Sequence, residues 1–102
     1  MAVTAPTLED LIRDLRALVP ELKARGVTRL AIFGSRARGD HRPDSDLDVV
    51  IEVEPTSSFS AVSLVGLERL LSEWLGVETR VAMPGSDNHF LDRIKGDLIE
   101  II

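Results

Sequence analysis

Asp46 and Asp48 lie two positions apart at the start of an apolar stretch that runs to Val53. Side chains at positions i and i+2 of a β-strand point to the same face, with their α-carbons about 7 Å apart. Two carboxylates placed in this way repel each other, and strands disfavour aspartate. Hard divalent cations such as Mg²⁺ prefer oxygen ligands and often bind one or two carboxylates together with substrate phosphates. The pair is therefore predicted to hold a divalent metal ion; the alternative is that these acids only keep a loop and a strand end soluble.

A second feature lies upstream, where Gly34 and Ser35 follow an apolar stretch that ends at Phe33 and are followed closely by Arg36 and Arg38. Where a strand ends in Gly-Ser and opens a helical turn, backbone N–H groups point at whatever lies there, and this suits a phosphate. A Gly-Ser turn after a strand is also common where it serves structure alone. The turn and the acidic pair together predict a site for a metal ion and a phosphate ligand.

The spacing of the apolar residues predicts the elements that must position these residues. Pro20 is expected to kink or divide the first helix. The final residues 99–102 fit either a helix or a short strand. In chain order the predictions are a helix over 8–25, strands at 27–33 and 47–53, a helix over 60–75, a strand at 77–83 and a helix that begins near residue 86 or 87.

This order indicates an α+β fold, a small mixed β-sheet flanked by helices. The first two strands are joined by residues 34–46 alone, which is a short connection for a parallel pair, so part of the sheet is expected to be antiparallel. Trp74 is predicted to belong to the core. The apolar tail from Leu98 to Ile102 has two interpretations, because it either completes the core or leaves an exposed patch that docks a partner.

The composition indicates one domain, residues 1–102, with 44% hydrophobic residues for its core. The absence of cysteine excludes a disulfide scaffold, a thiolate metal site and a cysteine nucleophile, and it fits a cytoplasmic protein. A net charge of −5 and an aromatic content of three Phe and one Trp argue against general nucleic-acid binding. No apolar run approaches the length of a membrane span.

The two motifs together resemble the signature of the polymerase-β-like nucleotidyltransferase superfamily. The sequences G-S-R-A-R-G at 34–39 and D-S-D-L-D-V at 44–49 are most similar to its minimal prokaryotic branch, the minimal nucleotidyltransferases. The resemblance extends over residues 8–98 and implies the polymerase-β-like nucleotidyltransferase fold. It also implies ATP as the substrate, Mg²⁺ as the cofactor, and transfer of a nucleoside monophosphate to an acceptor hydroxyl.

The resemblance implies two groups of site residues. The catalytic and metal-binding group would be Asp46 and Asp48, which bind Mg²⁺. The group that holds the nucleotide triphosphate and assists the leaving pyrophosphate would be Gly34, Ser35, Arg36 and Arg38.

A partner is also implied by the resemblance. Proteins of the minimal branch are commonly paired, as antitoxins, with a HEPN-domain toxin, so a hetero-oligomer is expected. In such pairs a tyrosine of the toxin receives AMP and the toxin is silenced. This chain contains no tyrosine, so it has no tyrosine of its own to modify.

One position departs from the pattern of the superfamily. Its active members carry a third carboxylate on a later strand, and counting back from Pro84 places Arg80 at that position. Arg80 is expected to pair with Asp46 or Asp48 and to fill the place of a metal ion. Glu78, two residues earlier, is the candidate third carboxylate, and an exposed ion pair between Glu78 and Arg80 is the structural alternative.

The departure leaves more than one function open. The first is an active transferase that adenylylates its toxin. The second is a catalytically degenerate nucleotide-binding module that neutralises the toxin by direct binding. A third is a nucleotide-sensing or purely structural subunit.

Overall fold

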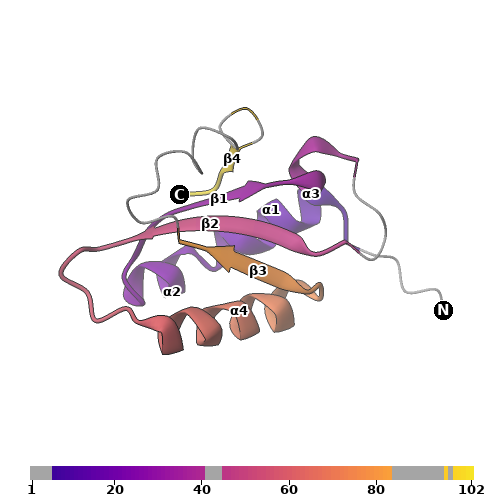
Figure 1. The fold of residues 1–102 in the computed structure, drawn as a ribbon. Helices are drawn as coiled ribbons and strands as arrows, with labels where there is room; N and C mark the ends of the chain where they lie inside the picture. Colours follow the sequence, from indigo (N-terminus) through magenta and orange to yellow (C-terminus); the bar gives the residue numbers. More distant parts are fainter. Residues whose placement is uncertain (1–5, 41–44, 84–95, 97) are drawn as a thin grey trace.

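A four-stranded β-sheet forms the centre of the molecule (Figure 1). The computed structural model describes residues 6–40, 45–83, 96 and 98–102. The strands are β1 (Val27–Phe33), β2 (Leu47–Val53), β3 (Thr79–Ala82) and β4 (Ile99–Glu100), and they lie in the order β3-β2-β1-β4. Strands β1 and β2 are antiparallel, β2 and β3 are parallel, and β4 runs antiparallel to β1. The predicted α+β fold with a mixed sheet is confirmed.

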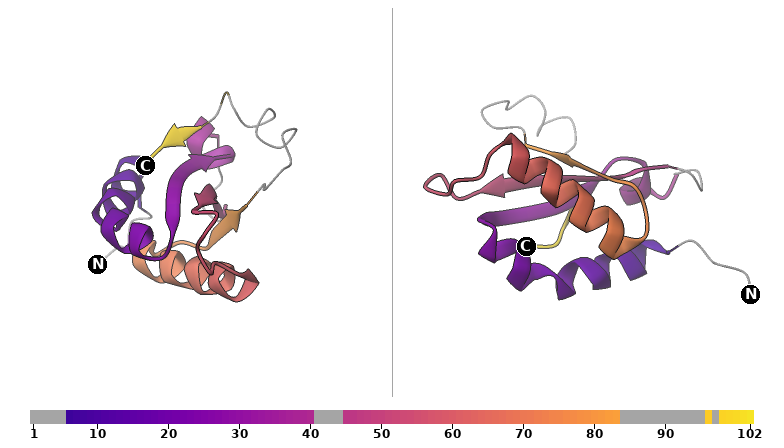
Figure 2. Two further views of the ribbon diagram at one scale, coloured as in Figure 1. Left: turned by 90° about the vertical axis from the view of Figure 1, so that its left-hand side faces the viewer. Right: turned by 90° about the horizontal axis from the view of Figure 1, so that it is seen from below.

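Three helices, α1 (Leu8–Ala17), α2 (Val19–Ala24) and α4 (Ala61–Leu75), pack on one face of this sheet (Figure 2). Their leucines meet the alternate strand residues that point to the same face, and burial of this apolar surface is the main force that stabilises the fold. The predicted break in the first helix is confirmed, because α2 begins around Pro20. The fully buried side chains in this layer include Leu11, Leu15, Leu22, Leu30, Ile32, Leu47, Val49, Leu67 and Leu71.

The prediction for Trp74 is wrong, because its side chain is 51% exposed. The core face of α4 is formed instead by Leu67, Leu71 and Leu75, which recur at the spacing of one helical face. The indole Nε1 of Trp74 donates to the backbone carbonyl of Asp14 at 2.9 Å. Trp74 therefore links α4 to α1 at the edge of the core.

The apolar tail completes the fold. Ile99 pairs with Ile32 of β1, and the backbone N–H of Ile101 donates to the carbonyl of Leu30 at 2.8 Å. The side chains of Ile99, Ile101 and Ile102 are partly buried against the core. Of the two interpretations of the tail, the one that assigns it to the core is confirmed. The helix predicted to begin near residue 86 or 87 lies outside the described residues.

Side chains of α4 fix the position of β3, which is an edge strand of the sheet. The backbone N–H of Thr79 donates to Ser72 Oγ at 2.9 Å, and that of Val81 donates to Glu68 Oε2 at 2.9 Å. These two acceptors, one helical turn apart, occupy N–H groups that an edge strand otherwise leaves open. The register of β3 is thereby set, and Arg80 lies opposite Asp48 of β2.

Replacing both Glu68 and Ser72 with alanine is expected to lower the free energy of unfolding by about 2 kcal/mol, since two part-buried hydrogen bonds are lost. Alanine favours the helix, so a loss does not reflect helix propensity. Urea denaturation measures the change. Glu73→Ala, an exposed position on the same helix, is the control and should leave stability within about 0.5 kcal/mol of the native value. A double variant as stable as the native chain would contradict the role given to α4.

No helix in the described part of the chain is long and apolar enough to cross a membrane.

Candidate functional site

The two aspartates lie at the start of the central strand β2. Leu47 and Val49 are fully buried against the helical layer. Because side chains alternate along a strand, Asp48, between them, points to the opposite face of the sheet. Asp46 comes directly before the strand, two residues from Asp48, and its side chain is 33% exposed. The pair therefore lies on the face of the sheet that the three helices do not cover.

Gly34 lies beside Asp48 of this pair. Phe33, the last residue of β1, pairs with Asp48 across the antiparallel ladder, so Gly34 comes directly beside the carboxylate. Gly34 has φ +80° and ψ −158°, a backbone conformation that is essentially restricted to glycine. A Cβ atom on Gly34 would lie 2.7 Å from Asp48 Oδ2. The predicted phosphate turn and the predicted metal pair are thus in direct contact, and only a residue without a side chain allows it.

A single helical turn, α3 (Ser35–Arg38), follows Gly34 and ends at Gly39, which is in the left-handed conformation. The backbone carbonyl of Ser35 accepts from the N–H groups of Gly39 and Asp40 at 2.9 and 3.1 Å, which closes the turn. The side chain of Arg38 is exposed, and its Nε lies 3.1 Å from Asp40 Oδ2. Ser35 and Arg38 therefore lie at the same end of the sheet as the acidic pair.

Arg36 has a different environment from Arg38, because it is 97% buried, with a relative exposure of 3%. Its Nε and Nη2 both donate to the backbone carbonyl of Ser45, at 3.1 and 2.9 Å. Ser45 immediately precedes Asp46. In this structure Arg36 ties α3 to the segment that carries the acidic pair. This contact was not foreseen from the sequence, where Arg36 and Arg38 look alike; their burial, which depends on packing, separates them.

Arg80 approaches the pair from the other neighbouring strand. It lies opposite Asp48 in the register of β2 and β3, and its Nε is 2.8 Å from Asp46 Oδ2. Of the two partners expected for Arg80, the structure selects Asp46. Glu78 lies just before β3 with an exposed side chain, and its backbone carbonyl accepts from the N–H of Leu47 at 2.8 Å.

The site is anionic. Burial raises the pKa of Asp48, and the nearby charge of Asp46 raises that pKa further, while Arg80 acts in the opposite direction. The ionised form of Asp48 is therefore held at a free-energy cost that a bound cation would relieve. Carboxylate oxygens are the ligands that Mg²⁺ takes, so the residues present fit a divalent metal ion. Within the described residues, no three His, Asp or Glu side chains group closely enough to hold a metal together, and the role of Glu78 as a third carboxylate stays a prediction.

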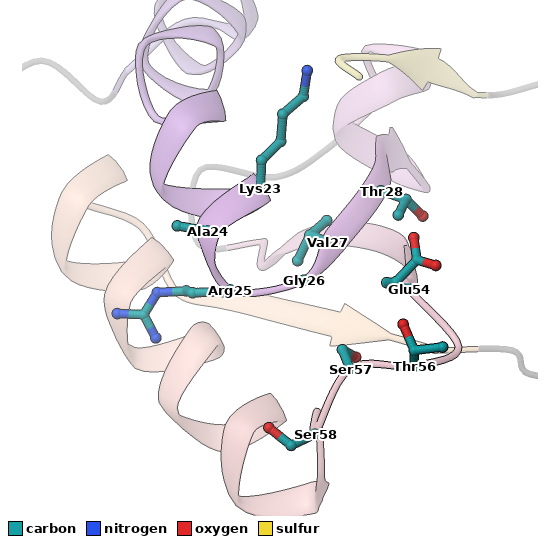
Figure 3. Close-up of a pocket in the computed structure, with 10 residues that line it drawn as sticks. All are labelled: Lys23, Ala24, Arg25, Gly26, Val27, Thr28, Glu54, Thr56, Ser57 and Ser58. Atoms are coloured by element: carbon teal, nitrogen blue, oxygen red, sulfur yellow. The ribbon is translucent and has the colours of Figure 1, made fainter.

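A surface hollow lies at the end of the sheet opposite to the acidic pair (Figure 3). It measures about 680 Å³ and lies between the turn from α2 to β1 and the segment after β2. Val27 beside it pairs with Val53, whereas Phe33 pairs with Asp48, so about 20 Å of strand separates the hollow from the acidic pair. Its two basic side chains, Lys23 and Arg25, point in different directions (Figure 3). The hollow is not part of the site built on Asp46 and Asp48.

Residues 11–102 match the family model described as a nucleotidyltransferase domain. The chain belongs to this nucleotidyltransferase family. A protein adenylyltransferase of Thermococcus cleftensis, MntA, is 35% identical over 81 residues, which cover 78% of this chain and 80% of that protein. A candidate protein adenylyltransferase of Methanocaldococcus jannaschii is 35% identical over 88 residues, which cover 85% of this chain and 92% of that protein.

Solved structures agree with this assignment. A candidate minimal nucleotidyltransferase superposes with a TM-score of 0.77 and 28% identity, over 95% of this chain and 98% of that one. A toxin–antitoxin crystallised with AMP-PNP superposes with a TM-score of 0.68 over 87% of this chain and 72% of that one, and at 14% identity it shares the fold alone. The resemblance to the minimal nucleotidyltransferases is therefore confirmed for this nucleotidyltransferase domain.

Proposed function

We propose that this nucleotidyltransferase is an antitoxin that transfers AMP from ATP to a tyrosine of a HEPN-domain toxin, with Mg²⁺ and in the cytoplasm. The observation that carries the proposal is the contact between the Gly34 turn and the Asp48 carboxylate, which brings a predicted phosphate site and a predicted metal site together. Relatives named as protein adenylyltransferases support the reaction type. The fold shared with a toxin–antitoxin crystallised with AMP-PNP supports the kind of partner and nucleotide.

Each site residue has its own role in the proposed reaction. Asp46 and Asp48 would hold Mg²⁺, which neutralises the charge of the triphosphate when it is bound. The turn at Gly34 and Ser35, with Arg38, would hold the triphosphate itself. Arg36 would act through Ser45, since its guanidinium donates two hydrogen bonds to the backbone carbonyl of Ser45.

The proposed transfer exchanges one bond to phosphorus for another. The toxin's tyrosine oxygen forms a bond to the α-phosphorus of ATP, and the bond from that phosphorus to the pyrophosphate breaks. The hydroxyl proton passes to a base, for which Glu78 is the candidate. Charge develops on the reacting groups in the transition state. Positioning of the triphosphate and stabilisation of this charge therefore account for most of the expected catalysis.

Labelled ATP tests the proposal. Incubation of this chain with α-labelled ATP, Mg²⁺ and the product of the neighbouring gene is expected to label that product on tyrosine. Asp46→Asn combined with Asp48→Asn is expected to reduce the labelling by about 10³-fold, because loss of the metal removes several kcal/mol of transition-state stabilisation. Gel autoradiography and mass spectrometry measure the result, with Glu21→Gln, on the distant helix α2, as the control. Absence of any transfer by the native chain would overturn the proposal.

A second candidate function is a nucleotide-binding module that neutralises the toxin by direct binding. The ion pair between Arg80 and Asp46 favours it, because Arg80 lies where a metal-dependent transferase of this superfamily is expected to carry a carboxylate. Neutralisation by the Asp46→Asn, Asp48→Asn variant separates the two functions. A transferase loses neutralisation with these changes, whereas a binding module retains it for as long as the toxin is bound.

A further inference from the structure

Arg80 places a fixed positive charge on one side of the acidic pair. Its Nε lies 2.8 Å from Asp46 Oδ2, and its side chain is 73% exposed. On the other side, Asp48 faces Gly34 at the end of β1. The order across the sheet is therefore cation, two carboxylates, and glycine turn, from β3 through β2 to β1.

The charges on these residues limit how many ions the site accepts. Asp46 and Asp48 contribute two negative charges and Arg80 contributes one positive charge, so the three side chains together carry a net charge of −1. Two-metal sites hold their ions about 3.5–4 Å apart, where two dications repel each other strongly unless several anionic ligands surround them. The part of the chain that the structure describes brings no third acid or histidine to this pair.

The arginine and a divalent cation are equivalent in charge. Replacing a carboxylate with an arginine changes the charge of a site by +2, which equals the charge carried by one divalent ion. Because Arg80 Nε lies 2.8 Å from Asp46 Oδ2, this positive charge acts directly on one of the two carboxylates. A charged hydrogen bond of this kind is among the stronger side-chain interactions.

We propose that this site binds one divalent cation with its nucleotide, rather than two, and that Arg80 supplies at Asp46 the positive charge that a second cation would bring. The inference rests on the proposed function, because it assumes that the site takes a nucleotide and a metal. It gives Arg80 a positioning role: it neutralises and orients Asp46, so that Asp46 and Asp48 together hold a single ion.

Electron paramagnetic resonance with Mn²⁺ tests the inference without a measurement of activity. The full chain is titrated with Mn²⁺ in the presence of a saturating non-hydrolysable ATP analogue. The native protein is expected to bind one Mn²⁺ per chain and to give the spectrum of an isolated ion. Arg80→Asp is expected to bind two, with the exchange-coupled spectrum of neighbouring ions, because it removes the competing cation and adds a ligand at the same register position.

Two further variants separate the local effect from a general charge effect. Arg69 on α4 and Arg80 on β3 line one surface hollow. Arg69→Asp makes the same change in net charge there and is expected to keep one ion per chain. Arg80→Ala removes the cation without adding a ligand and is also expected to keep one ion. Circular dichroism and urea denaturation check that each variant is folded.

The outcomes are distinct. The inference is overturned if the native chain, with the analogue bound, holds two ions or none. It is also overturned if Arg80→Asp still holds one ion. Either result leaves nucleotide binding intact. A native chain that binds no analogue at all overturns the proposed function itself. One ion in the native chain and two in Arg80→Asp support the inference.

Discussion

Gly34→Ala is expected to abolish metal-dependent nucleotide binding and to lower the free energy of unfolding by about 2–4 kcal/mol. The backbone of Gly34, at φ +80° and ψ −158°, is strained for any residue with a side chain. The added Cβ would also lie 2.7 Å from Asp48 Oδ2, so the carboxylate has to leave its position. Urea denaturation measures the loss of stability, and isothermal titration with ATP and Mn²⁺ measures the loss of binding.

Gly76→Ala is the matched control for this experiment. Gly76 also has a positive φ, +75°, but a Cβ atom there would meet nothing within 4 Å. The variant is expected to lose about 1 kcal/mol of stability through backbone strain alone and to bind nucleotide as the native chain does. If Gly34→Ala bound nucleotide with native affinity, the contact between the turn and the acidic pair would be unnecessary, and the site as described would be wrong.

Arg36→Met is expected to destabilise the free chain by about 2–3 kcal/mol, in the absence of any nucleotide. Methionine retains most of the buried volume, but the carbonyl of Ser45 loses the two N–H groups of the Arg36 guanidinium that donate to it. The segment that leads into Asp46 is then held less firmly, so Mn²⁺ affinity in the presence of an ATP analogue is expected to fall about tenfold, as when an outer hydrogen bond to a metal site is removed. Urea denaturation and titration with Mn²⁺ measure the two effects.

Arg38→Met is the matched control for Arg36→Met. Arg38 is exposed, so its removal is expected to change the stability of the free chain by less than about 0.5 kcal/mol and to act on nucleotide affinity alone. Arg36→Lys, which keeps the charge but not the two-donor geometry, is expected to recover only part of the stability. If Arg36→Met were as stable as the native chain and affected nucleotide affinity alone, Arg36 would be a phosphate ligand, as first predicted from the sequence, and not an anchor for Ser45.

The helices and strands of this protein follow from features that lie close together in the chain. The strands at Val27–Phe33 and Leu47–Val53 have the predicted bounds, and the helix break near Pro20 and the helix end at Gly76 also agree with the structure. These are effects of apolar periodicity and of residues with restricted or unusual backbone angles, which act within a few positions. The exception is Trp74, whose helical spacing did not reveal that it faces the edge of the core.

The types of the site residues were also evident before the fold was known. Paired aspartates at a strand entry and a Gly-Ser turn are unusual enough together to predict a metal and phosphate site, which stays a prediction, whereas the nucleotidyltransferase family that they resemble is shown by the family match. The expectation that Arg80 pairs with an aspartate rests on charge alone, and charge did not distinguish Asp46 from Asp48.

The contacts that give each site residue its role depend on the tertiary structure. The register of β3 against β2, which Glu68 and Ser72 help to fix, decides that Arg80 reaches Asp46. Packing of α3 decides that Arg36 is buried on the Ser45 carbonyl while Arg38 remains exposed. A shift of one residue in β3 would turn Arg80 to the other face of the sheet. Amino-acid types and local spacing therefore suffice to predict most of the described strands and helices and the nucleotidyltransferase family, but the pairing of strands distant in the sequence decides which charged groups meet.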